Sequence, residues 1–117
     1  MKRMPDFFEA VRKHCLAKPH ATQDEPWPGD IAWKVGGKIF AMWGGNGTAC
    51  VKSTLDKQAA LVQHPHISVA SYVGRFGWVS IELPDEEMLE LTLDLIDESY
   101  TMVASKVPKR LLAKAES

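Results

Sequence analysis

The residues of this chain that could do chemistry are basic side chains interleaved with large aromatic rings. Between residues 31 and 83 there are five bases (Lys34, Lys38, Lys52, Lys57 and Arg75) and two acids (Asp56 and Glu82). Cationic side chains bind phosphates, and exposed aromatic rings stack on unpaired bases. The candidate residues for binding nucleic acid or another partner are Lys34, Lys38, Trp43, Lys52, Arg75 and Trp78. Tyr72 offers a further ring for stacking.

The other reactive side chains do not form a recognisable catalytic set. His14, His64 and His66 could act as acids or bases, but none belongs to a nucleophile–base pattern. Two histidines spaced two apart could bind a metal from a strand, yet no nearby cysteine or carboxylate completes that set. The GGNG segment at residues 44–47 lacks the lysine and the helix of a phosphate-binding loop. We therefore expect no catalysis, no metal and no cofactor.

The composition is typical of an ordinary globular protein of one domain, which we place at residues 1–117. Charged residues make up 25% and hydrophobic residues 45% of the chain, and the formal net charge is -1. This balance argues against a strongly basic nucleic-acid binder but leaves room for a local basic patch. Cys15 and Cys50 are far apart in the sequence, and we expect both to be buried thiols in a reducing compartment. Without a signal-peptide pattern or a long apolar run, the expected location is the cytoplasm, with no membrane contact.

The segment from residue 31 to residue 53 predicts three antiparallel strands joined by two glycine turns. A two-residue turn at Gly36-Gly37 would pair Trp33 with Phe40 and Ile31 with Met42. If the second turn closes on Trp43 and Thr48, the sheet has one apolar and one mixed face. The predicted apolar face is Ile31, Trp33, Val35, Phe40, Met42, Ala49 and Val51. The predicted open face is Ala32, Lys34, Ile39, Ala41, Trp43, Thr48, Cys50 and Lys52.

The flanking segments supply helices and two further strands. Apolar residues at helical spacing predict helices at residues 5–18, 54–63 and 84–107, and alternation predicts strands at residues 67–72 and 76–83. A short edge strand near residues 21–24 is an additional possibility. In the second helix the apolar stripe would be Leu55, Ala59 and Val62. The sum is a two-layer α+β domain, with an antiparallel sheet and its helices on one face.

Two features of these segments remain open to alternative interpretations. Trp78 either shares the open sheet face with Trp43 or is buried where its strand begins. The last helix carries seven acids and no base between Asp85 and Glu98. Its acidic side is either a solvated surface, which we favour, or a docking face for a basic partner.

Three stretches resemble the MmcQ/YjbR family of small bacterial proteins. They are PWPGDIAWKVGGKIFA (residues 26–41), SYVGRFGWVSIEL (residues 71–83) and ESYTMVASKVPKR (residues 98–110). The resemblance implies the element order α-β-β-β-α-β-β-α and an architecture similar to that of type III secretion chaperones. Members are often labelled DNA-binding, and the family supplies no agreed catalytic motif.

Two functions follow from these observations. The first is nucleic-acid binding through the open sheet face and its hairpins. The alternative is a protein-interaction or dimerisation module, in which that face or a strand edge receives a protein partner or a second copy. The expected state in solution is a monomer or a weak homodimer.

Overall fold

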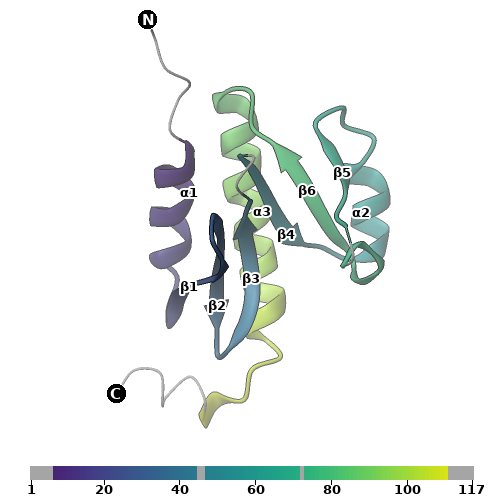
Figure 1. Cartoon of the computed structure of the whole chain (residues 1–117). Coiled ribbons are helices and arrows are strands. Elements are labelled where there is room, and N and C mark those ends of the chain that lie inside the picture. The colour runs from purple at the N-terminus through teal and green to yellow at the C-terminus, as the bar shows by residue number, and fades with distance from the viewer. Residues whose placement is uncertain (1–6, 45–46, 72, 111–117) are drawn as a thin grey trace, which may run out of the picture.

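The computed structural model describes residues 7–44, 47–71 and 73–110. Within these residues six strands form one antiparallel sheet, accompanied by three α-helices (Figure 1). The strands are β1 (Ala21–Trp27), β2 (Asp30–Val35), β3 (Lys38–Trp43), β4 (Thr48–Lys52), β5 (Ile67–Val69) and β6 (Trp78–Glu82), in the sheet order β1-β2-β3-β4-β6-β5. The helices are α1 (Phe7–Leu16), α2 (Leu55–Leu61) and α3 (Glu86–Ala104), and a short 3-10 turn, η1 (Gly74–Phe76), precedes β6. The predicted α+β class is confirmed.

The first strand is longer than the sequence indicated. We expected at most a short edge strand near residues 21–24, but β1 has seven residues and pairs with β2 along its length, with one irregularity after Asp24. Four strands therefore precede α2, one more than in the order that the family resemblance implied. Pro26 is tolerated within β1 because this strand lies at the edge of the sheet.

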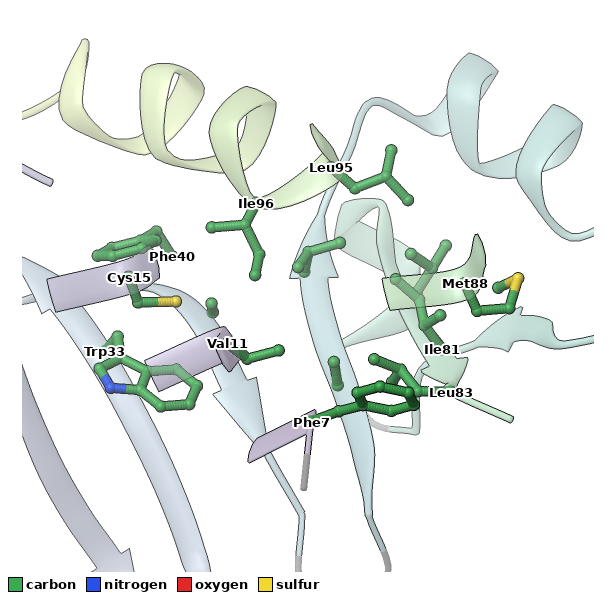
Figure 2. Packing of buried hydrophobic residues seen from close by; sticks show 14 of the residues in the cluster. Phe7, Val11, Cys15, Trp33, Phe40, Ile81, Leu83, Met88, Leu95 and Ile96 are labelled. Carbon is green, nitrogen blue, oxygen red and sulfur yellow. The ribbon is translucent and has the colours of Figure 1, made fainter. Parts of the chain in front are cut away.

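The hydrophobic core lies between the sheet and the layer formed by α1 and α3. Figure 2 shows Ile96 of α3 directed into the cluster, toward Phe40 of the sheet and Val11 and Cys15 of α1. Trp33 is fully buried in the same cluster. Burial raises the pKa of the Cys15 thiol to about 12, although Lys18 opposes this shift, so Cys15 is an inert core residue.

The strand register differs from the prediction because of a β-bulge in β3. Near the turn, Lys34 pairs with Ile39 as expected, but Trp33 then pairs with Ala41, so Phe40 is the extra residue. Phe40 and Ala41 are both buried. The predicted pairing of Trp33 with Phe40 is wrong.

The bulge moves Trp43 from the open face to the core face. Trp43 pairs with Ile31 on one side and with Ala49 on the other, in a row that continues to Ile81. Its ring lies 5.6 Å from that of Phe8 on α1, in an edge-to-face arrangement. The prediction that Trp43 belongs to an open binding face is therefore wrong.

Met42 makes the opposite exchange and lies on the open face instead of the core face. There it pairs with Cys50, which pairs in turn with Ser80. The second turn closes through a hydrogen bond from Gly44 N to Thr48 O at 2.9 Å, one residue away from the predicted closing pair. Part of this turn, residues 45–46, lies outside the described residues.

The ends of the helices follow their sequence signals, whereas the buried side of α2 does not. Thr54 accepts a hydrogen bond from Lys57 N and caps α2, as predicted. Leu55, however, is 59% exposed, and the residues of α2 and its C-cap that pack on the core are Leu61 and Val62. The predicted stripe of Leu55, Ala59 and Val62 is wrong because the helix docks by its C-terminal end.

Part of the acidic side of α3 is neutralised by bases from other elements. Asp97 pairs with Lys18 and with His14, whose Nε2 lies 2.7 Å from its carboxylate, and Glu98 pairs with Lys57. Burial raises the pKa of Asp97, but the hydrogen bonds from Lys18 and His14 outweigh it and lower that pKa below its ordinary value. These pairs connect α3 to α1 and α2.

Two glycines hold conformations that a side chain would disturb. Gly36 has φ +58° in the β2–β3 turn, and a Cβ there would overlap the side chain of Val107. Gly77 has φ +95°, and its Cβ would overlap the backbone carbonyl of Ser53. Both positions therefore have structural reasons to be glycine. No helix among the described residues has the length and apolar character to cross a membrane.

Candidate functional site

Strands β3 and β4 separate at one end of the sheet, and a serine from α3 bridges them. The two strands pair only from Ala41 to Trp43 on the β3 side. Beyond that point, the buried hydroxyl of Ser99 donates to Phe40 O at 2.6 Å and accepts from Lys52 N at 3.0 Å. Figure 1 shows the two strands diverging toward the end that holds the β2–β3 turn, where α3 also ends. The ladder is thus interrupted without leaving these backbone groups unpaired.

A cleft opens where the strands part. Its volume is about 450 Å³, and it is lined by Lys38, Ile39, Lys52, Trp78, Met102, Val103 and Lys106. We call this hollow the basic cleft, because every charged residue in its lining is a lysine. Such a combination of apolar walls with a few polar groups is typical of ligand sites.

The three lysines of the basic cleft meet no acidic partner in the part of the chain that the structure describes. Lys38 and Lys106 are exposed and Lys52 is half-buried. Among the described residues no carboxylate forms an ion pair or hydrogen bond with any of the three ammonium groups. Their positive charge is therefore available to an anion from solution.

The structure brings together three of the six residues predicted as a binding site. Lys38, Lys52 and Trp78 all line the basic cleft. Trp78 is only 8% exposed, in agreement with the alternative that it is buried where its strand begins. Lys52 pairs directly with Trp78 in the β4–β6 register, which explains why the two side chains are neighbours.

The other candidates lie elsewhere. Lys34 forms a 3.0 Å ion pair with Asp24 across β1 and β2 and is absent from the lining of the cleft. Arg75 is exposed on η1, with its guanidinium carbon 4.8 Å from the centre of the Phe76 ring. Tyr72 lies outside the described residues.

Two cleft residues, Met102 of α3 and Lys106 just after it, were not named from the sequence. Ser99 and Met102 are three residues apart and lie on one side of the helix, and Lys106 follows four residues later, beyond the last turn, which is a local signal. That signal does not say which strands this side meets. Only the docking of α3 over the parting strands brings Lys106 near Lys52.

A second hollow offers fewer groups that could bind a charged ligand. On the open face, Met42, Cys50 and Ser80 form an uncharged row within this hollow. Burial raises the pKa of Cys50, although a hydrogen bond with Ser80 opposes it.

The histidine pair directly precedes β5, at the opposite edge of the sheet from the β1 strand that α1 contacts. His66 Nδ1 lies 3.2 Å from Glu82, and the rings of His64 and His66 are 5.6 Å apart. Across the described ranges no group of three or more potential metal-binding side chains gathers.

A six-stranded antiparallel sheet with α1 and α3 packed on it defines a small α+β protein, and comparison with known proteins identifies the family. The sequence profile of the YjbR family matches residues 16–102, so the chain belongs to the YjbR family. Among solved structures, the fold is similar to that of the Deinococcus radiodurans protein DR2400, whose domain is designated DUF419. The TM-score is 0.75 at 22% identity, over 89% of this chain and 86% of that one. Comparison with curated proteins gave no match.

Proposed function

We propose that this chain is a cytoplasmic nucleic-acid-binding protein that uses the basic cleft as its binding surface. The observation that carries the proposal is the convergence of Lys38, Lys52 and Lys106 on one hollow, with no acidic partner among the described residues. When several lysines bind the phosphates of a nucleic acid, the counterions condensed on that nucleic acid are released, and this release favours association. Nucleic acid is the common ligand that presents several phosphates along one chain.

The distribution of charge supports binding at this end of the molecule. The net charge is -1, so the surface as a whole does not attract a polyanion. Two acids on α3, Asp97 and Glu98, are paired with bases and do not offset the cleft lysines directly. A local concentration of positive charge can orient a polyanion even when the net charge is near zero.

Salt dependence of binding tests the proposal. We expect a labelled single-stranded oligonucleotide to bind with an affinity that falls steeply between about 50 and about 200 mM salt. Lys52→Ala or Lys106→Ala should lower the slope of log K against log salt by about 0.7–0.9, since each removes one phosphate contact. Fluorescence anisotropy at several salt concentrations measures both quantities.

The matched control is Lys34→Ala, because Lys34 lies on the same sheet but is paired with Asp24. This variant should retain both the affinity and the slope of the parent protein. Absence of binding at low salt, or an equal loss in the Lys34 and Lys52 variants, would remove the basic cleft as the interface.

A second candidate function is protein interaction on the β5 side of the sheet. Among the residues that the structure describes, the exposed large hydrophobic side chains are Leu55 at 59%, Val69 at 54% and Phe76 at 54%. Val69 lies on the short edge strand β5, and a Cβ on Gly74 of η1 would overlap its side chain, so η1 and β5 are in close contact. Exposed apolar side chains beside an open strand edge favour association with another protein or a second copy.

Sedimentation of the pure protein over a wide concentration range tests the dimeric form of this candidate. A dimer that dissociates in the Val69→Lys variant would support it. A monomer at the highest concentration would eliminate self-association through β5.

A further inference from the structure

The apolar part of the basic cleft indicates which form of nucleic acid it binds. We infer that the ligand is a single strand, with one unpaired base inside the cleft and the adjoining phosphates on the surrounding lysines. This inference rests on the proposed function and adds the ligand class and the way it is held.

The lining of the cleft is suited to a flat, mostly apolar group attached to an anionic chain. Ile39 comes from β3, Trp78 from β6, and Met102 and Val103 from α3, so apolar side chains approach from three elements. A surface that bound phosphates alone would need no apolar hollow. The volume of about 450 Å³ lies within the range of sites that enclose small organic groups.

The three lysines surround the opening of the cleft, where the nucleic-acid backbone on either side of the bound base would lie. Lys38 follows the β2–β3 turn, Lys52 ends β4, and Lys106 follows α3, so the three charges come from separate elements around one opening. Proteins that bind single strands commonly combine a cationic track with apolar or aromatic surfaces for the bases.

The end of α3 does not use the ammonium groups of these lysines to satisfy its own carbonyl groups. Its last four acceptors receive hydrogen bonds from Ser105 N, Ser105 Oγ, Lys106 N and Val107 N. The acceptors are Thr101, Met102, Val103 and Ala104. The ammonium group of Lys106 is therefore not needed as a cap.

A duplex fits this part of the molecule less well. Direct reading of a duplex requires an element that projects into a groove, usually a helix or a β-ribbon. The β2–β3 turn is the projecting element nearest to the cleft, but Gly36 is packed against the side chain of Val107. In a duplex the bases are stacked and paired, so none can enter the cleft without being extruded.

The test compares three probes of equal length, about 12 nucleotides, on the intact chain. They are a single strand with bases, an abasic strand with the same number of phosphates, and a duplex. We expect the strand with bases to bind at least about fivefold more tightly than either of the others, since contact with a base adds to the phosphate term.

Substitutions in the cleft locate the base. Met102→Ala removes part of the apolar wall and keeps all three lysines, so it should reduce the preference for the strand with bases and leave abasic binding unchanged. The matched control is Met42→Ala, which shortens a half-buried methionine on the open face away from this cleft. The control should retain the full preference.

The outcomes separate this inference from the proposed function. Equal, salt-dependent binding of all three probes would overturn the inference and leave nucleic-acid binding intact. No binding of any probe at low salt would overturn both. A free mononucleotide that binds as tightly as the strand would also overturn the inference, because the ligand would then be a small anionic molecule.

Discussion

Replacement of Ser99 by alanine tests whether the hydroxyl bridge holds the parted strands in place. Ser99 is fully buried, and its single hydroxyl group serves Phe40 O and Lys52 N at once. The substitution removes both hydrogen bonds and leaves the helix propensity at this position unchanged or improved. Any loss of stability therefore reports on the bridge.

The magnitude follows from the burial of the two backbone groups. Leaving the buried carbonyl oxygen of Phe40 without a donor costs about 1–3 kcal/mol. The Lys52 amide is only partly buried, so leaving it without an acceptor costs an amount near the lower end of that range. Together they should reduce the free energy of unfolding by about 2–3 kcal/mol. With a urea dependence of about 2 kcal/mol per M, the midpoint of unfolding falls by about 1 M.

Urea denaturation followed by tryptophan fluorescence measures this change. The control is Ser105→Ala, since the Ser105 hydroxyl donates to Met102 O at an exposed position. Ser105→Ala should change the free energy of unfolding by less than about 0.5 kcal/mol. If Ser99→Ala is as stable as Ser105→Ala, the two strands are held by something other than the bridge, and our account of how the cleft is formed fails.

Three further predictions concern stability and reactivity. Gly77→Ala should destabilise the fold by more than about 2 kcal/mol in urea denaturation, whereas Gly29→Ala, at similar φ in open space, should cost about 1 kcal/mol. The lowered pKa of Asp97 contributes stability that is present above the ordinary carboxyl pKa and lost as pH falls through the lowered value. Asp97→Asn should therefore flatten the fall in unfolding free energy below about pH 4, and Asp94→Asn, at an exposed site on the same helix, should not. Cys15, with its pKa raised to about 12, should resist a thiol reagent at neutral pH until the chain is unfolded; rapid reaction of the native protein would contradict its burial.

The fold class could be predicted from the sequence because its signals are local and repeated. Apolar spacing identified α1 and α3, and Thr54 and the acids after Pro84 placed the starts of α2 and α3. Alternation identified most strands. These signals depend on neighbours within a few residues, which a sequence displays directly.

The faces of the central strands could not be predicted in the same way. One extra residue at Phe40 reverses the direction of every later side chain in β3, and this moved Trp43 to the core and Met42 to the open face. The shift in pairing from Lys34–Ile39 to Trp33–Ala41 shows the bulge in the structure. In the sequence the same residues are compatible with an uninterrupted strand.

For a related reason, only part of the candidate site could be predicted from the sequence. Lys38, Lys52 and Trp78 belong to strands whose neighbours could be guessed, and they do meet. Met102 and Lys106 join them only because α3 crosses the gap between β3 and β4, and Lys34 is removed by its pairing with Asp24. Contacts between elements distant in sequence carry no periodic signal.

The location of the bound strand tests the central claim most directly. In an NMR titration of the isotopically labelled protein with a short single-stranded oligonucleotide, we predict shifted backbone signals at Lys38, Ile39, Lys52 and Lys106, together with the side-chain signal of the Trp78 indole. Signals from the open-face row of Met42, Cys50 and Ser80 should stay in place. Shifts confined to that row, or no shift at low salt, would contradict the claim that the basic cleft binds nucleic acid.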